Sequence, residues 1–136
     1  YYVSGDVFGE CANAYVTACG QYWPAISAVV DAISGMPYPD HYSARGDYKP
    51  WEHPYDTVHM FGESAAARQS ETASPAAVRT WIQCYNAIRE PYNHYGAAEL
   101  ADEVRALRDT GNTGGFMTWN GASDIGKYAE VIGALN

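Results

Sequence analysis

The sequence predicts an α/β fold in which parallel strands alternate with helices. Strand-like and helix-like segments follow one another four times, at about 30 residues a unit, the length of a typical βα unit with its crossover. Strands connected in this way pair in parallel through right-handed crossovers. Hydrophobic residues make up 47% of the chain and charged residues 18%, a globular balance, and 136 residues suit a single domain.

The first unit begins with a strand over residues 1–9, YYVSGDVFG. This segment opens on aromatic and β-branched residues and ends at glycine, which indicates a buried strand with Asp6 near its exit. After a loop, apolar residues recur at helical spacing in WPAISAVV, where Pro24 suits the first turn of a helix.

The second unit begins with a short apolar strand at residues 32–37, AISGMP. Residues 38–55 are too rich in Pro, Gly, Tyr and charge for regular structure and are expected to form a long loop. Asp56 is the expected N-cap of a helix that ends near Ser70. Its buried face is expected to hold Val58, Phe61, Ala65 and Ala66.

The third and fourth units are the clearest in pattern. Residues 78–85 alternate as a strand, with Val78, Thr80, Ile82 and Cys84 on one face and Arg79, Trp81, Gln83 and Tyr85 on the other. Residues 96–109 predict a helix that stops at Gly111, with a stripe of Ala97, Leu100, Ala101, Val104 and Leu107. A strand over 115–120 and a helix over 125–135 complete the chain.

Two parallel architectures fit four such units. An open doubly wound sheet that binds a small ligand would need helices to cover its outer strands, and the sequence offers no spare helix. The first turn, DVFGECAN, also lacks the glycine-rich pattern of a dinucleotide site. Polar and aromatic residues at each strand exit favour about half of a (β/α)₈ barrel of TIM type, because these residues would converge on one mouth. Residues 1–136 are therefore expected to form a single incomplete barrel domain.

The strand exits supply the candidate site, since barrels of this type bind ligands at the C-terminal ends of their strands. Carboxylates can act as acid, base or nucleophile on a glycosidic bond, while amides, imidazole and aromatic rings suit sugar hydroxyls and faces. We expect Asp6 to be catalytic, because an acid within an apolar strand is costly unless it is paired or used. The expected substrate-binding residues are Tyr38, Asp40, His41, Tyr42, Trp81, Gln83, Tyr85, Trp119 and Asn120.

Other classes of function find little support. The net charge is −8 and the basic residues are scattered, which argues against nucleic acid, and no apolar run approaches the roughly 20 residues of a membrane span. No zinc spacing, serine elbow or phosphate loop is present, so no metal or cofactor is expected. The spacing of Cys11 and Cys19 allows a disulfide in an oxidising compartment, and an extracellular or cell-envelope location is expected.

The ordered motifs SGDVFG, CGQYWPAISAVVDAISGMPYPDHY, HPYDTV, VRTWIQCY and YGAAELADEVRALRDTGNTGGFMTWNGAS resemble a bacterial family, the putative glycoside hydrolase domain DUF4015. The resemblance implies that the four units are strands five to eight of a TIM barrel. It implies that Asp6, the Asp of the DVFG motif, faces a second Asp on the fourth strand, which would precede Tyr1. Asp40 departs from the resemblance, because the family commonly has Ser at that position.

The sequence therefore predicts a glycoside hydrolase domain that acts on polysaccharide through paired carboxylates, one of them missing from this chain. The other half barrel would be a separate chain, a further part of the same polypeptide or a second copy of this one. The alternative is a non-catalytic carbohydrate-binding or structural half barrel, in which Asp6 only bonds sugar hydroxyls.

Overall fold

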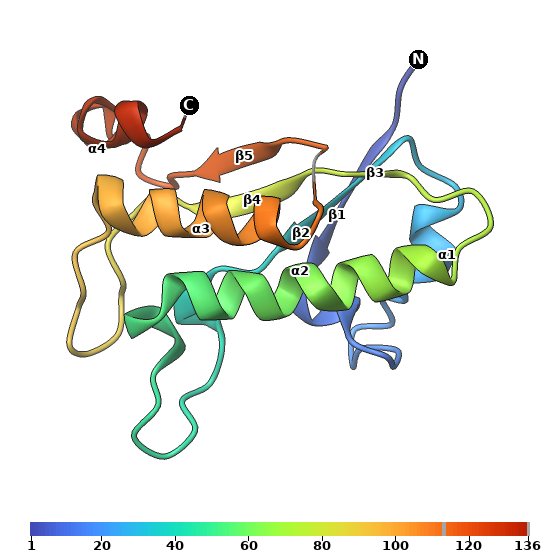
Figure 1. The fold of residues 1–136 in the computed structure, drawn as a ribbon, viewed down its shortest axis with the longest axis horizontal. Helices are drawn as coiled ribbons and strands as arrows, with labels where there is room; N and C mark the ends of the chain where they lie inside the picture. The colour runs from blue at the N-terminus through green and yellow to red at the C-terminus, as the bar shows by residue number, and fades with distance from the viewer. Residues whose placement is uncertain (113, 136) are drawn as a thin grey trace.

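A computed structural model of the chain describes residues 1–112 and 114–135 and shows strands alternating with helices (Figure 1). The strands are β1 (Ser4–Phe8), β2 (Ala32–Met36), β3 (Ala77–Val78), β4 (Thr80–Gln83) and β5 (Phe116–Trp119). The α-helices are α1 (Trp23–Ser27), α2 (Pro54–Ser70), α3 (Ala97–Asp109) and α4 (Ile125–Val131). The described residues also form short 3₁₀ turns, which are η1 (Gly9–Ala12), η2 (Pro39–His41), η3 (Pro50–Glu52) and, directly after α4, η4 (Ile132–Ala134).

The strands pair in parallel, and neighbours in sequence are neighbours in space, as predicted. β1, β2 and β3 form one sheet in that order, with Asp6 opposite Ser34, and β4 and β5 form a second. The predicted strand over 78–85 is interrupted at Arg79, which lies between β3 and β4 and donates its backbone N–H to Ile33 O at 3.0 Å. The prediction of a parallel α/β fold is confirmed, and the described residues do not form a closed barrel.

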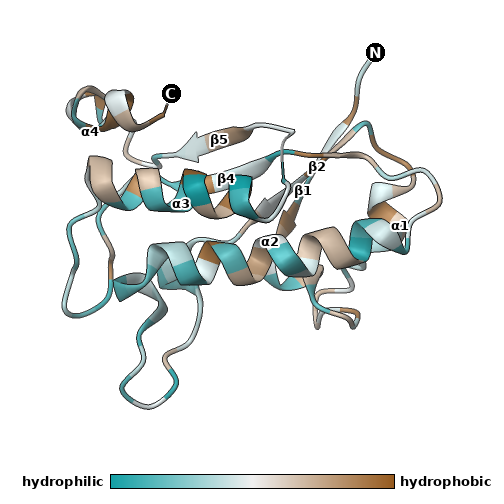
Figure 2. Ribbon diagram, in the orientation of Figure 1, coloured by the Kyte–Doolittle hydropathy of each residue, from teal (hydrophilic) through white to brown (hydrophobic). Residues whose placement is uncertain are grey.

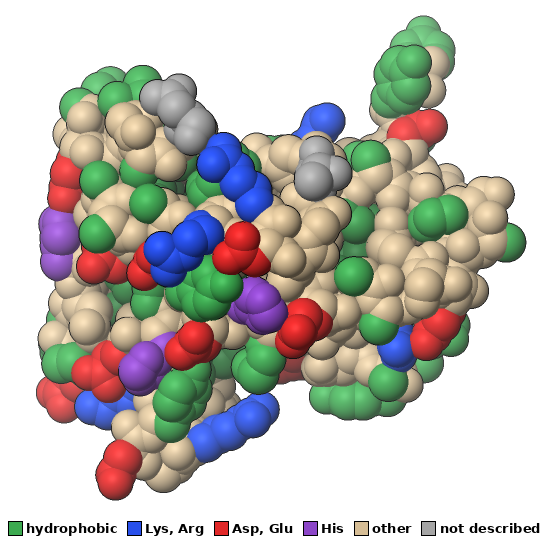
Figure 3. Space-filling view, in the orientation of Figure 1, with side chains coloured by type: hydrophobic (Ala, Val, Ile, Leu, Met, Phe, Trp, Pro, Cys, Tyr) green, Lys and Arg blue, Asp and Glu red, His purple; other side chains and the backbone are tan. Residues whose placement is uncertain are grey.

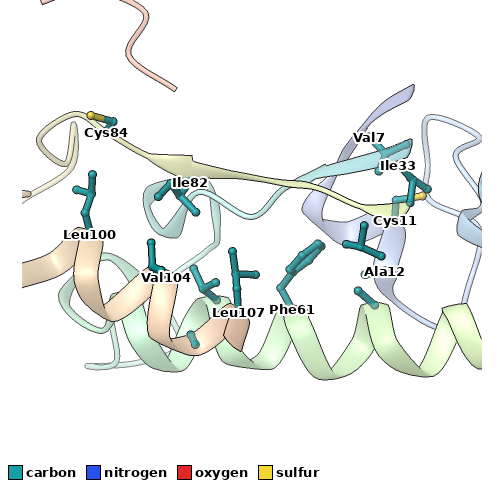
Figure 4. Packing of buried hydrophobic residues seen from close by; sticks show 14 of the residues in the cluster. Val7, Cys11, Ala12, Ile33, Phe61, Ile82, Cys84, Leu100, Val104 and Leu107 are labelled. Carbon is teal, nitrogen blue, oxygen red and sulfur yellow. The ribbon is translucent and has the colours of Figure 1, made fainter. Parts of the chain in front are cut away.

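Helices α2 and α3 run side by side along one face of the strands, and their apolar side chains form the core (Figures 1 and 4). Phe61 of α2 and Leu100, Val104 and Leu107 of α3 point toward the strands, where Ile82 meets them. Bands of hydrophilic and hydrophobic residues alternate along both helices (Figure 2), as expected for helices with one face on a sheet. Figure 1 draws the short helix α4 near the end of β5, on the side of the strands away from α2.

Two close contacts fix the positions of α1 and α2 relative to β2. Gly35 of β2 has no space for a side chain, because a Cβ there would overlap the Phe61 ring. Trp23 of α1 is fully buried, packs its ring edge-on against Phe61 and donates its indole N–H to Gln69 Oε1 of α2 at 2.9 Å. The two helices are thus anchored to the same side of β2.

Helix α2 begins earlier than predicted. Its first residue is Pro54, and His53 takes the cap position, so the assignment of Asp56 as N-cap is wrong. Proline favours the first helical position because its fixed φ suits the helix and it has no N–H to satisfy. Asp56 lies in the first turn, where its negative charge complements the helix dipole. Of the expected buried face, Ala66 is exposed.

Helix α3 matches its predicted bounds but is rotated relative to the predicted stripe. Leu100, Val104 and Leu107 are buried as expected, and Gly111 follows the helix with φ 74°, which confirms it as the stop. Ala97 and Ala101 are exposed, and Glu103 and Ala106 are buried in their place. Hydropathy alone assigns a glutamate to the solvent, so it placed the buried face one position too far around the helix.

The ends of the chain differ from prediction in extent. The first strand begins at Ser4, and Tyr1 and Tyr2 lie exposed before it. The predicted helix over 125–135 is α4 followed by the 3₁₀ turn η4. None of the helices in residues 1–112 and 114–135 combines the length and apolar character that crossing a membrane requires.

Candidate functional site

The carboxyl ends of β1 and β2 open onto a cavity of about 550 Å³. The segments that follow β1, β2 and β4 together form its wall. Its lining residues are Phe8, Gly9, Glu10, Thr17, Ala18, Cys19, Met36, Asp40, His41, Tyr42, Ile88 and Arg89. Three of the predicted site residues, Asp40, His41 and Tyr42, therefore line a pocket of ordinary ligand size.

Asp6, Trp81 and Trp119 form a second group, which lies across three strands. The indole Nε1 of Trp81 donates to Asp6 Oδ1 at 3.0 Å, and the Trp81 ring packs edge-on against Trp119 with centroids 6.0 Å apart. Asp6 is exposed rather than buried, so the expectation that burial strains its charge is wrong. Trp119 is also exposed. The group offers an ionisable carboxylate beside two indole rings, an arrangement that suits a sugar ring and a proton transfer.

Asp40 is committed to bonds within the protein. Its side chain is completely buried. Its carboxylate accepts from the Tyr85 hydroxyl at 2.8 Å and from the Ile88 backbone N–H at 3.2 Å, and its own backbone N–H donates to Gln83 Oε1 at 3.3 Å. These bonds hold η2 against the segment that leaves β4. Asp40 thus shapes the cavity wall and has no free oxygen for chemistry.

Gln83 links this network to a carboxyl group that the sequence pattern did not single out. Gln83 is fully buried, donates its side-chain amide to Tyr85 O at 3.3 Å, and donates its backbone N–H to Glu103 Oε1 at 3.3 Å. Glu103, on α3, is also fully buried, and its Oε2 has no hydrogen-bond partner among the described residues. Burial raises the pKa of Glu103 well above its usual range, because a low-dielectric environment favours the neutral acid over the carboxylate.

Tyr38, His41 and Tyr42 lie in and beside the 3₁₀ turn η2 that carries Asp40. Tyr38 is buried and packs edge-on against His41 at 5.1 Å and against Tyr85 at 6.1 Å. The His41 ring is half exposed, with Nε2 3.5 Å from the Tyr85 hydroxyl and 3.8 Å from Asp40 Oδ1. Burial, the largest cause in each case, raises the pKa values of Tyr38, Tyr42 and Tyr85, so these phenols remain neutral hydrogen-bonding groups at physiological pH.

Asn120 belongs to neither group in the part of the chain that the structure describes. Its side-chain Nδ2 donates to Asp124 O at 3.1 Å and its Oδ1 accepts from Asp124 N at 3.4 Å. Asp124 is the N-cap of α4, where its carboxylate accepts from Gly126 N and Lys127 N. Asn120 therefore holds the turn that leads into α4, and its predicted contact with a sugar remains without geometric support.

The structure leaves Cys11 and Cys19 as free thiols, so the disulfide that their spacing allowed is not formed. Cys11 is fully buried in the core and Cys19 is exposed at the cavity. Burial, followed by the nearby Cys19, raises the pKa of the Cys11 thiol to about 11. Cys11 is thus protonated at neutral pH and a poor nucleophile.

The hydrogen bond between Tyr85 and Asp40 can be tested against a matched control. Tyr55 makes an equally short bond to the carboxylate of Asp109 on the surface. We expect Tyr85→Phe to lower the free energy of unfolding by about 1–3 kcal/mol, since a buried carboxylate then loses a donor. Tyr55→Phe should lower it by less, because water can replace that bond. Urea denaturation measures both, and equal losses would contradict the structural role given to Asp40.

Several cavity residues were not predicted. Phe8, Glu10 and Met36 lie at or just beyond strand ends, where the strand-exit rule could have found them once the strand bounds were known. Ile88 and Arg89 lie in the segment between β4 and α3, and no local pattern marks them. The outer surface over α2 and α3 is different in character: acidic, basic and histidine side chains are interspersed there (Figure 3). The ion pair between Arg105 and Asp102, both on α3, is one example.

Comparison with known proteins identifies a family for the chain but no individual relative. No curated protein and no solved structure matches the chain. Residues 1–125 match the family DUF4015, described as a putative glycosyl hydrolase domain, and the chain belongs to that family.

Proposed function

We propose that this chain is the C-terminal half of a (β/α)₈ barrel that hydrolyses glycosidic bonds in a polysaccharide. The parallel pairing of β1 with β2, β2 with β3 and β4 with β5 supports this proposal, because successive strands of such a barrel pair in parallel. Membership of a glycosyl hydrolase family supports carbohydrate as the substrate class. The observation that carries the proposal is the position of Asp6, exposed beside Trp81 and Trp119 and two residues before the end of β1.

In this proposal Asp6 is the general acid and base. Hydrolysis of a glycosidic bond needs two carboxyl groups on opposite sides of the bond. Asp40 is locked by Tyr85 and Ile88, so it does not supply the second. The second carboxylate comes from the other half of the barrel, which covers the exposed strands.

The bonds that Asp40 makes to Tyr85 and Ile88 also favour a second candidate function, which is carbohydrate binding without catalysis. With Asp40 committed to bonds within the protein, the domain could bind carbohydrate on its indole rings without cleaving it. Release of reducing ends from a panel of polysaccharides separates the two functions, because binding alone releases none. We expect release from the complete barrel and none from the 136-residue chain alone. Release by the chain alone, with light scattering showing a monomer, would reject the shared-site proposal.

A further inference from the structure

The cavity at the ends of β1 and β2 has a mixed character that an unsubstituted sugar does not match. Phe8, Met36 and Ile88 give it apolar surface from three separate segments, while Glu10 and Arg89 provide one charge of each sign. A hexose carries hydroxyl groups around its ring, and burying these against apolar side chains leaves them without partners. The cavity therefore fits a ligand with both an apolar and a hydrogen-bonding part.

The cavity adjoins the Asp6 group along β1. Side chains two apart on a strand share a face, so Phe8 follows Asp6 at a rise of about 7 Å. Phe8 lines the cavity and is itself half exposed, whereas Asp6 lies outside the lining. The cavity therefore begins two residues along β1 from the proposed position of the reacting bond.

We propose that this cavity takes the acyl group of an N-acylated amino sugar. The inference rests on the proposed function for the placement of the scissile bond at Asp6, and it adds the substrate class. An acylamino group combines an apolar chain, which Phe8, Met36 and Ile88 can cover, with an amide N–H and C=O. The Glu10 carboxylate can accept from the amide N–H and the Arg89 guanidinium can donate to its carbonyl. The volume of about 550 Å³ leaves room for acyl chains longer than acetyl.

Cys19 provides a reporter that needs no catalysis. It lines the cavity and is exposed, whereas Cys11 and Cys84 are fully buried. The rate at which iodoacetamide alkylates Cys19 in the folded chain, measured by mass spectrometry, therefore reports whether a ligand occupies the cavity.

The experiment measures the alkylation rate of Cys19 in the 136-residue chain against increasing glucose, N-acetylglucosamine and N-butanoylglucosamine. We expect the two acylated sugars to slow alkylation and glucose to leave it unchanged. Each methylene that becomes buried should tighten binding about fourfold, so the butanoyl sugar should protect at about a fifteenfold lower concentration than the acetyl sugar. Equal protection by all three sugars, or by none, would overturn the proposal.

Two exposed isoleucines give a matched pair of variants. Ile88 lines the cavity and is 67% exposed, and Ile132 is 65% exposed on the turn η4, which does not contribute to the lining. Ile88→Asp should abolish the preference for the longer acyl chain, whereas Ile132→Asp should preserve it. Identical behaviour of the two variants would place the acyl group elsewhere.

Failure of the acyl-site proposal can be distinguished from failure of the proposed hydrolase function. Acyl-dependent protection without reducing-end release from any acylated polysaccharide would keep the cavity assignment and reject hydrolysis. Hydrolysis of unacylated polysaccharides, with no acyl-dependent protection of Cys19, would keep the hydrolase and reject the acyl site.

Discussion

Asp6→Asn in the complete barrel is expected to lower the rate of polysaccharide hydrolysis by about 10²–10⁴-fold, the usual contribution of a general acid or base. The amide cannot exchange a proton in this role. Its carbonyl oxygen can still accept from the Trp81 indole, which donates to Asp6 Oδ1 in the structure. Because the side chain is also exposed, the melting temperature should remain close to that of the unaltered protein.

Asp31 supplies the control for this substitution. It is another exposed aspartate and also accepts a hydrogen bond, from Val3 N at 2.7 Å, but it lies just before the start of β2, at the amino ends of the strands and away from the cavity. Asp31→Asn should leave turnover unchanged. Reducing-end release under saturating substrate compares the two variants. A rate for Asp6→Asn as high as that of the Asp31 variant would remove Asp6 from the chemistry and favour the binding function.

The fold could be predicted to the level of element order because each segment carries its own periodicity. The alternation over residues 78–85 and the helical pattern over 96–109 are local signals, and both elements form near the predicted bounds. The break at Arg79 depends on how the strand meets Ile33 across the sheet, and no local pattern encodes that pairing. The start of α2 at Pro54 follows a known preference, but the competing Asp56 concealed it.

The candidate site was predictable in membership and not in arrangement. The strand-exit rule selected Asp6, Trp81 and Trp119, which the structure brings together, and Asp40 and Tyr85, which bond each other. The residues separate into two groups because the Trp81 indole donates to Asp6, whereas the Tyr85 hydroxyl donates to Asp40. The catalytic and binding roles of these residues stay predictions. Glu103 was overlooked because a charged residue on a helix is ordinarily solvated, and only the rotation of α3 against β4 buries it.

Glu103 also gives the chain an expected dependence of stability on pH. In the unfolded chain a glutamate titrates near pH 4.3. In the folded chain burial raises the pKa of Glu103 well above that value, and the nearby Asp40 carboxylate acts in the same direction. Between the two pKa values the folded chain retains a proton that the unfolded chain has released. The contribution of Glu103 to stability is therefore complete below about pH 4 and is lost as the pH rises, at about 1.4 kcal/mol per pH unit between the two pKa values.

Glu103→Gln should remove this loss while preserving the bond to β4. The amide oxygen can accept from Gln83 N as Glu103 Oε1 does, and the amide has no proton to release. The advantage of the variant in free energy of unfolding should thus grow as the pH rises above about 4, as measured by urea denaturation. Glu52→Gln, at an exposed glutamate of η3, is the control and should show no such growth. A constant difference across this range would mean that Glu103 is ionised in the folded chain, and the neutral acid beneath Gln83 would have to be abandoned.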